Sequence, residues 1–396
     1  MEECRTITTD ARHIMIEFAE QTGISSTKTP PRRYLWTDAH AVCNFLSLYR
    51  QTKDQVYADL AHSLVDQVHN VLGRHRHDDP RSGWISGLAD EEGKNHPTAG
   101  GLRIGKKLNE RALDEPFDER LEWDRDGQYF HYLTKWMHAL SRASTVTGES
   151  QFCRWAVELA KVAHARFTTA LAAGAPKRLL WKMSIDLSYP LLPSTGLHDP
   201  LDAYITYNEL SLCAEKHCRD VALPDLELEI AETAEMIENR RWHTEDPLGL
   251  GGLLFDACRV LQLTAAGQLH DPSIAESLLH ASAESLAYFA ARSPLANPAE
   301  FRLAFRELGL SIGLRAVTKL HNIVLSRPDL FAASLRNDIH ALKKFVPLGE
   351  AIEHFWLQDN NQKVVTWADH LDINRVMLAT SLLPDEFLNA AEFPPA

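Results

Sequence analysis

The chain has 396 residues, of which 45% are hydrophobic and 24% are charged. These fractions are typical of a globular protein with enough apolar material for a core, and they exclude a fibrous or largely disordered chain. The formal net charge is −13, from 41 Lys and Arg against 54 Asp and Glu, and no basic run stands out. Because such a surface repels a phosphate backbone, we predict that nucleic acid is not a partner.

The N-terminal segment, residues 1–23, is acidic and lacks the basic and apolar regions of a signal peptide. No apolar run reaches the length that we expect of a membrane-spanning helix. We therefore predict a cytoplasmic protein without a membrane partner. The sequence leaves open whether the protein forms a homo-oligomer.

Six cysteines are scattered over the chain, mostly within helical patterns: Cys4, Cys43, Cys153, Cys213, Cys218 and Cys258. We expect them to be buried free thiols. Cys213 and Cys218 have His217 between them, but their spacing does not place both sulfurs on one helix face. We therefore predict no zinc site there.

The regular part of the chain begins after an amphipathic helix at residues 11–21 and an extended arm that contains Pro30 and Pro31. Residues 36–49 are apolar on nearly every face, which indicates a helix buried on several sides. Residues 55–72 form one apolar stripe and follow a Thr-x-acid turn at Thr52. This is a buried helix followed by an amphipathic one.

A long connection over residues 74–128 contains buried-type apolar residues and is expected to be ordered. The following stretch, residues 119–142, combines the acids Glu122, Asp124 and Asp126 with Trp123 and then becomes a helix rich in aromatic residues. A second Thr-x-acid turn at Thr147 leads to an amphipathic helix over residues 150–167. The pattern of the first pair is thus repeated.

A second long connection, residues 168–199, suggests one or two short strands around RLLWKMSIDL. Four further helix pairs are expected: residues 201–218 with 226–240, 253–265 with 273–290, 300–320 with 330–344, and 348–356 with 367–383. Long connections between pairs and short ones within pairs favour an all-α (α/α)6 barrel over residues 34–396, preceded by an N-terminal helix and arm at residues 1–33. An open helical solenoid is the alternative, but no fixed repeat period supports it.

If the long connections meet at one end of the barrel, the starts of the inner helices converge there. Their polar and aromatic residues are Trp36, Asp38 and His40; Glu122, Trp123, Asp124 and Asp126; His198, Asp199 and Asp202; Trp242, His243, Glu245 and Asp246; Arg302, Arg306 and Glu307; and Trp367, Asp369, His370 and Asp372. Carboxylates and imidazoles are groups for proton transfer, and Trp faces suit the CH surface of a sugar ring. We therefore predict a saccharide site.

Simpler structural roles compete with this prediction. Asp38, Asp199 and Asp369 stand where helix N-caps are expected. His131, Lys135 and His138 share one helix face, where a buried, hydrogen-bonded histidine is the commoner outcome, although His131 is close enough to the helix start to reach a ligand.

Metal binding is not predicted anywhere in the chain. His75 and His77 could ligate a metal with Asp79, but an exposed charged turn explains the same residues. The acids between Glu122 and Asp126 leave an all-acid calcium site open as an alternative, although they do not have the spacing of an EF-hand loop. We predict neither a metal nor another cofactor.

The segments WTDAHAVCNFLSLY and YFHYLTKWMHALSRASTVTGESQFCRWAVELAKVAHARF, with the later hairpins, resemble the six-hairpin glycosidase-like proteins, and among them the N-acylglucosamine 2-epimerase and cellobiose epimerase group. This resemblance implies an (α/α)6 barrel that binds mono- or oligosaccharides at its mouth. It implies histidine acid–base chemistry in an epimerase and carboxylate chemistry in a hydrolase. His370, in WADHLDINRVML, is the nearest candidate for an epimerase histidine.

Three functions follow as hypotheses. In a hydrolase, Asp124 or Asp126 would be the general acid or base, and an inverting reaction would need a second carboxylate roughly 6.5–9.5 Å away, from Asp38, Asp199 or Asp372. In an epimerase, His370 would act with another histidine. The third hypothesis is a non-catalytic scaffold that binds a protein or peptide. The residues expected to contact a saccharide are Trp36, Asp38, His40, Glu122, Trp123, His131, Asp199, Trp242, Arg302, Trp367 and Asp372.

Overall fold

The computed structural model describes residues 2–26, 28–170, 172, 175–219 and 222–391. It divides into two compact units, one of residues 19–238 and one of residues 1–18 and 239–396. Each unit is described by itself below. The predicted boundary between an arm at residues 1–33 and a domain at 34–396 stays a prediction.

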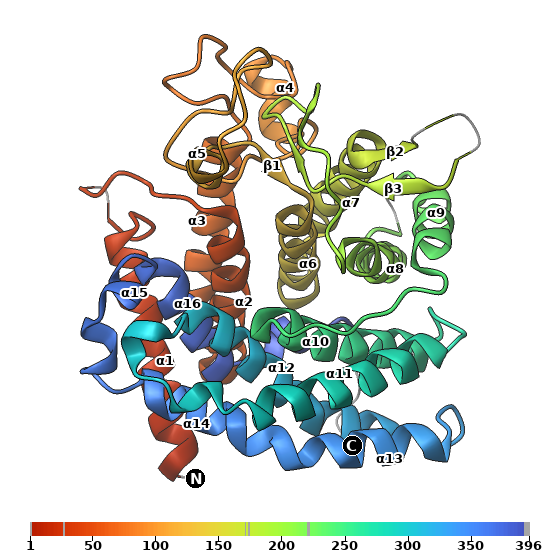
Figure 1. Cartoon of the computed structure of the whole chain (residues 1–396). Helices are drawn as coiled ribbons and strands as arrows, with labels where there is room; N and C mark the ends of the chain where they lie inside the picture. Colours follow the sequence, from red (N-terminus) through yellow and green to blue (C-terminus); the bar gives the residue numbers. More distant parts are fainter. Residues whose placement is uncertain (1, 27, 171, 173–174, 220–221, 392–396) are drawn as a thin grey trace. The chain divides into compact units, whose positions relative to one another are not determined.

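The unit of residues 19–238 contains three pairs of long helices and a small sheet (Figure 1). Its elements are α2 (Leu35–Thr52), α3 (Gln55–Leu72), α4 (Asp90–Asn95), α5 (Glu119–Asp124), β1 (Gln128–Tyr129), α6 (Phe130–Thr147), α7 (Ser150–Phe167), β2 (Thr168–Ala170), β3 (Lys177–Leu179), β4 (Lys182–Met183), β5 (Pro190–Leu192), α8 (Asp199–His217) and α9 (Glu227–Ile237). Helix α1 (Glu2–Gln21) runs into this unit from the other one.

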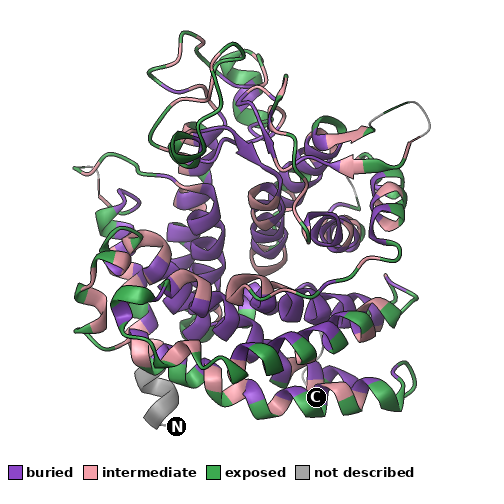
Figure 2. Cartoon of the chain, viewed as in Figure 1, coloured by how far each residue is buried: buried purple, intermediate pink, exposed green. Residues whose placement is uncertain are grey.

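In this unit α6 packs against α2 and α8, while α3, α7 and α9 each pack against the long helix that precedes them. Helix α2 is buried from Leu35 through Leu48, whereas α3 buries one stripe and exposes the opposite face (Figure 2). The predicted alternation of buried and amphipathic helices is therefore confirmed here. The two Thr-x-acid turns also match, because the Thr52 and Thr147 hydroxyls each accept a bond from the backbone N–H two residues on, both at 3.2 Å.

The two long connections of this unit meet in a three-stranded antiparallel sheet of order β1–β4–β5. Strand β1 ends the connection of residues 74–128, and β4 and β5 belong to the connection of residues 168–199. Gln128 pairs with Met183 and Tyr129 with Lys182. The predicted short strands are confirmed, and the sheet places Trp181 and Lys182 beside the start of α6.

The second unit holds the remaining helix pairs. Its elements are α10 (Pro247–Ala265), α11 (Ser273–Ala291), α12 (Ala304–Ser326), α13 (Ala333–Leu342), α14 (Val346–Trp356), α15 (Val365–Ala368), α16 (Leu371–Leu382) and α17 (Asp385–Leu388), with short 3-10 turns at Pro294–Ala296, Ala299–Phe301, Lys343–Phe345 and Asn361–Lys363. Helix α12 packs against α10, α14 and α16. The predicted helix over residues 367–383 is two helices, α15 and α16, separated at Asp369 and His370.

Helices α10 and α12 approach each other closely at glycines. A side chain at Gly251 would overlap the carbonyl of Gly309, and one at Gly313 would lie 2.5 Å from the Cα of Gly251. By length and composition α10 could cross a membrane, but 78% of its most apolar window is buried within the protein, as in the core helix of many soluble proteins. It is therefore weak evidence for a membrane span.

Five cysteines are buried free thiols, as predicted: Cys43, Cys153, Cys213, Cys218 and Cys258. The side chain of Cys4 lies outside the described part of the structure.

Candidate functional site

Aromatic residues gather where β1 leads into α6, and two of them, Trp36 and His131, are among those that the sequence singled out. Five rings form one continuous layer here, which we call the aromatic layer: Trp36, Tyr129, His131, Tyr132 and Trp181. Tyr129 stacks on Trp181 at 5.3 Å between ring centroids, and Tyr132 lies 5.2 Å from Tyr129 and 5.3 Å from Trp36. The layer thus joins α2, α6 and the strand region of residues 168–199.

His131 is held in one tautomer by this layer. The indole N–H of Trp181 donates to Nδ1 of His131 over 3.2 Å. The neutral ring must then carry its proton on Nε2. Burial, and after it the charge of Lys135, lowers the pKa of His131 to about 3, while the charge of Asp202 opposes this change. The imidazole is therefore neutral near pH 7 and offers an N–H from Nε2.

One helical turn beyond His131, a carboxylate and an ammonium group meet between α6 and α8. Oδ2 of Asp202 accepts a bond of 2.5 Å from the Thr134 hydroxyl and one of 2.8 Å from Nζ of Lys135. The Asp202 and Lys135 side chains are 7% and 12% exposed. We call His131, Thr134, Lys135 and Asp202 the acid–base cluster, because it combines a hydrogen-bond donor, a carboxylate and a cation.

A second histidine–carboxylate pair lies farther along the same two helices. Nδ1 of His138 is 2.9 Å from both carboxylate oxygens of Glu209, and both residues are about 1% exposed. His40 on α2 donates from Nδ1 to the Trp36 carbonyl at 3.0 Å, and its pKa is lowered to about 3 by burial first and by the charges of Lys135 and His138. Helices α2, α6 and α8 thus contribute imidazole or carboxylate groups to one region.

Asp126, predicted as catalytic, is enclosed by hydrogen-bond donors. Its Oδ2 accepts bonds from Arg103 at 2.9 Å and Arg76 at 3.3 Å, and its Oδ1 accepts from the backbone N–H groups of Gly105 and Gly127. The carboxylate is fully buried. The Asp126 carboxylate, with its four hydrogen-bond donors, stabilises the connection of residues 74–128. A carboxylate enclosed in this way is not placed to exchange a proton with a ligand.

The other acids of this stretch separate into a buried one and an exposed one. Glu122 is 4% exposed and pairs with Lys182 at 2.8 Å and with Arg111 at 3.3 Å. Asp124, at the end of α5, is exposed, and next to it Trp123 is 55% exposed, with its ring centroid 6.2 Å from that of Trp181 in a T-shaped arrangement. Asp124 and Trp123 are therefore accessible beside the aromatic layer, whereas Glu122 is not.

The two expected caps at α2 and α8 lie in the first turns of their helices. Oδ2 of Asp38 accepts from the backbone N–H of Tyr34 at 2.9 Å, and Arg33 lies 3.5 Å from its other oxygen. Asp38 is thus a helix-start carboxylate, in keeping with the simpler structural role. Asp199 is buried at the first residue of α8, three positions before Asp202.

In the unit of residues 1–18 and 239–396, two predicted ligand contacts belong to a buried network. Arg302 pairs with both oxygens of Glu307 at 2.6–3.1 Å, and Trp356 donates to the same carboxylate at 2.8 Å. Trp367, 2% exposed, stacks on Trp356 at 5.5 Å. Arg302 and Trp367 therefore make contacts that are typical of residues in a protein core.

The remaining predicted residues of that unit are placed differently. His370 is exposed and its ring is 5.3 Å from Phe305. Trp242 is buried, and Asp372 lies in the first turn of α16.

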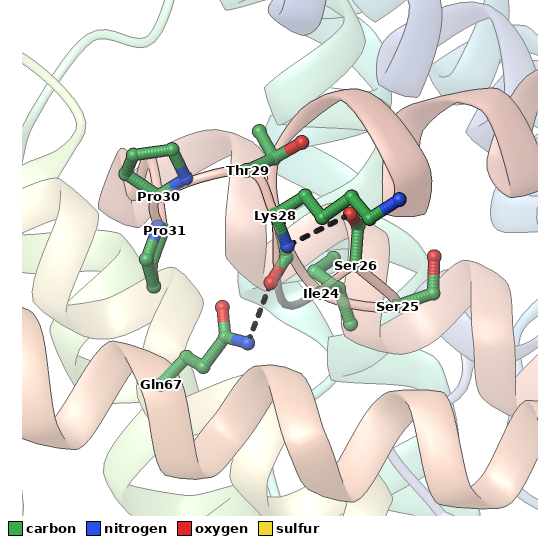
Figure 3. Close-up of a pocket in the computed structure, with 9 residues that line it drawn as sticks. Ile24, Ser25, Ser26, Lys28, Thr29, Pro30, Pro31 and Gln67 are labelled. Atoms are coloured by element: carbon green, nitrogen blue, oxygen red, sulfur yellow. Dashed lines mark hydrogen bonds between the residues drawn. The ribbon is translucent and has the colours of Figure 1, made fainter.

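The described residues hold no group of three His, Cys, Asp or Glu side chains arranged to bind a metal ion. A surface pocket of about 460 Å³ is lined by residues 23–26, 28–31 and by Gln67 of α3 (Figure 3). Gln67 donates there to the Gly23 carbonyl at 2.9 Å. None of the residues of the aromatic layer or the acid–base cluster lines this pocket.

Sequence reasoning did not select Tyr129, Tyr132 and Trp181 of the aromatic layer, nor Tyr34 and Lys106 beside it. Tyr34 and Tyr132 share a hydroxyl–hydroxyl bond of 2.7 Å, and Nζ of Lys106 is 5.3 Å from the Tyr34 ring. Trp181 lies in the strand-like stretch RLLWKMSIDL. A tryptophan within a long connection was the sequence feature that could have indicated its place in the site.

No family model and no curated protein matches this chain. Solved structures do. Two inactive double-aspartate variants of an alpha-1,6-mannanase of Salegentibacter sp. HEL1_6, in complex with alpha-1,6-mannotriose and alpha-1,6-mannotetrose, each align over 95% of this chain and 99% of that chain, with TM-score 0.52 and 12% identity. The cellobiose 2-epimerase of Bacillus thermoamylovorans B4167 covers 80% of this chain at TM-score 0.44 and 10% identity, a likeness too low to argue from. The mannanase comparison confirms the predicted all-α (α/α)6 fold class.

Proposed function

We propose that this protein is a carbohydrate-active enzyme, and that the acid–base cluster beside the aromatic layer is its reaction centre. The observation that carries the proposal is the ion pair between Asp202 of α8 and Lys135, which lies one turn along α6 from His131. The ring of His131 belongs to the aromatic layer. Aromatic faces hold the CH surface of a sugar, and polar groups at their edge hold its hydroxyls. The mannanase that shares this fold was solved with oligosaccharides bound, which supports a saccharide ligand.

In this proposal Asp202 is the carboxylate that exchanges a proton or stabilises positive charge at the sugar carbon. Thr134 and Lys135 hold its Oδ2 at 2.5 and 2.8 Å, so the group is fixed in orientation without a further ordering cost during the reaction. His131 donates a hydrogen bond from Nε2 to a substrate oxygen. Asp124, exposed beside Trp123, remains the candidate for a second carboxylate from the connection of residues 74–128.

We propose hydrolysis in preference to epimerisation. An epimerase needs a basic imidazole to remove a proton from carbon, but the bond from Trp181 leaves the proton of His131 on Nε2 and burial disfavours its cation. Carboxylates of the kind found at Asp202 serve glycoside hydrolysis directly. The variants of the related mannanase that are described as inactive have two aspartates replaced, which is consistent with carboxylate chemistry on this fold. His370 stays a prediction for the epimerase alternative.

The test is turnover by purified full-length protein. We would incubate it with alpha-1,6-mannotriose, cellobiose and a set of 4-nitrophenyl glycosides, and follow released reducing sugar and, separately, the 2-epimer by chromatography. Asp202→Asn should lower turnover about 100-fold or more, since it removes the ionised group but keeps the acceptor for Thr134. His370→Ala should leave turnover unchanged.

Two results would count against the assignment. Full turnover in Asp202→Asn would remove Asp202 from the chemistry. Accumulation of the 2-epimer with sensitivity to His370→Ala would replace the hydrolase with the epimerase. A separate variant, Asp124→Asn, changes an exposed carboxylate of the same region and tests whether a second acid is used.

A further inference from the structure

One ammonium group beside the aromatic layer has no anionic partner within the described residues. Six cations of this region are paired: Arg103 and Arg76 with Asp126, Lys182 and Arg111 with Glu122, Arg125 with Glu115, and Lys135 with Asp202. Nζ of Lys106 forms neither a hydrogen bond nor an ion pair with any residue that the structure describes, and it lies 5.3 Å from the centre of the Tyr34 ring.

The surroundings of Lys106 are costly for a lone cation. The residue is half-buried, and its pKa is lowered by burial first and then by the like charge of Lys182, while the charges of Asp124 and Asp126 oppose the change. A partly desolvated ammonium group that lacks acceptors is destabilising, and an incoming anion would relieve that cost. By contrast Lys107, the next residue, is exposed to solvent.

Lys106 also belongs to the site that the proposed function uses. The Tyr34 ring under its Nζ lies 5.6 Å from the ring of Tyr132, to which it is also joined by the hydroxyl–hydroxyl bond. Tyr132 in turn lies 4.7 Å from the ring of His131. A sugar that rests on the aromatic layer would therefore have the acid–base cluster at one edge and Lys106 near another.

We infer that Lys106 binds the anionic group, a carboxylate or a phosphate, of an acidic saccharide whose ring lies on the aromatic layer. This inference rests on the proposed function and names its substrate class. A compact, flexible ammonium group binds either anion as a point charge, so the geometry by itself does not choose between a uronic acid and a sugar phosphate. The chemistry common to both is a negative group attached to a pyranose ring.

The experiment compares matched pairs of ligands by isothermal titration calorimetry on the full chain. The pairs are glucuronic acid with glucose and mannose 6-phosphate with mannose, and inorganic phosphate is the sugar-free probe. We expect the acidic member of at least one pair to bind about tenfold or more tightly than its neutral partner, with affinity falling as ionic strength rises. The pair that shows the preference identifies the anion.

Lys106→Met should remove that preference and weaken the acidic ligand roughly 10- to 100-fold, while the neutral sugar is bound as before. Lys107→Met, which removes a charge at the adjacent exposed position, should change neither. Lys106→Arg should restore most of the preference, and thermal melts of all three variants would show that they are folded.

The outcomes separate this inference from the proposed function. If neutral and acidic sugars bind equally, or if Lys106→Met keeps the preference, the role of Lys106 is wrong and the saccharide site stands. If inorganic phosphate binds but no sugar improves on it, both the saccharide function and the acidic-saccharide inference are wrong. If none of the five ligands binds, both are likewise overturned.

Discussion

The indole nitrogen of Trp181 donates to Nδ1 of His131 over 3.2 Å, and the planes of the two rings are only 17° apart. A residue of an outer connection thereby decides which nitrogen of an inner-helix histidine carries the proton. Because a hydrogen-bond donor to substrate is needed on Nε2, the outer connection is part of the reaction centre that we propose.

Trp181→Phe should remove this control while keeping most of the ring contact with Tyr129. We expect a mixture of His131 tautomers and a fall in turnover of about tenfold, since a positioned donor is lost without loss of the imidazole. Nitrogen-15 chemical shifts of labelled histidine would report the tautomer directly. A single unchanged tautomer in the variant would contradict the role of Trp181.

Buried His69 should make the protein less stable as the pH falls below about 6.5. Its Nε2 accepts from the Trp136 indole at 3.2 Å, and burial lowers its pKa to about 3. Between these values the unfolded chain binds a proton that the folded chain does not, so stability rises with pH. His69→Gln should therefore reduce the loss of stability between about pH 7.5 and about pH 5 by about 2 kcal/mol, measured by denaturant unfolding.

His62 provides a control of opposite sign. Burial alone would lower its pKa, but bonds to the Ala58 carbonyl and to Glu149 raise it overall. Its contribution to stability is present below the unfolded pKa and is lost as the pH rises through the folded pKa. His62→Gln should thus change the pH dependence in the direction opposite to His69→Gln. If both variants change the pH dependence of stability in the same direction, the direction assigned to at least one of the two histidine pKa shifts is wrong.

Asp126→Asn should destabilise the protein by about 3 kcal/mol, because it leaves the buried Arg103 without a carboxylate partner among the described residues and removes one of the two carboxylates that Arg76 contacts. Asp124→Asn, two residues earlier and exposed, should change stability by less than about 0.5 kcal/mol. Chemical denaturation of both variants gives the comparison. Equal and small effects would return Asp126 to the set of catalytic candidates.

Trp123→Ala should weaken saccharide binding without lowering the melting temperature, since the side chain is 55% exposed beside Trp181. Trp367→Ala should instead destabilise by about 3 kcal/mol or more, because that ring is 2% exposed and stacked on Trp356. Thermal melts with and without the ligand identified by calorimetry distinguish the two. A large loss of stability in Trp123→Ala would show that Trp123 is a structural residue.

Gly251→Ala should destabilise the protein by about 3 kcal/mol, because the added methyl group would overlap the backbone of α12 at Gly309. Gly252, on the same helix, has no atom within 4 Å of an added Cβ. Gly252→Ala should therefore raise stability by up to about 1 kcal/mol through helix propensity. Melting temperatures of this adjacent pair test whether close backbone contact between α10 and α12 requires glycine.

Helix periodicity was sufficient to predict the main helices, because burial on several faces and a single apolar stripe leave different patterns in a sequence. It located α7 at its observed bounds and missed the break between α15 and α16, where Asp369 and His370 interrupt a stretch that reads as one helix. Local pattern does not report such a break.

The candidate site was predicted less well, for a physical reason. Asp124 and Asp126 are two residues apart in sequence, yet one is exposed and the other is enclosed by Arg103 and Arg76 from distant positions. Similarly, the partner of His131 is Trp181, 50 residues away. Long-range partners of this kind decide whether a carboxylate or an imidazole is free to react, and a single sequence does not display them.

The pairing of β1 with β4 has a consequence for how this protein could be re-engineered or could diversify. Backbone hydrogen bonds join residues 128–129 to residues 182–183, so the two outer segments share one register. Grafting one of them from a relative with a different specificity would leave its strand without a matching partner. A functional chimera would have to exchange the connections that contain β1 and β4 together. We expect the two connections to change together during evolution as well.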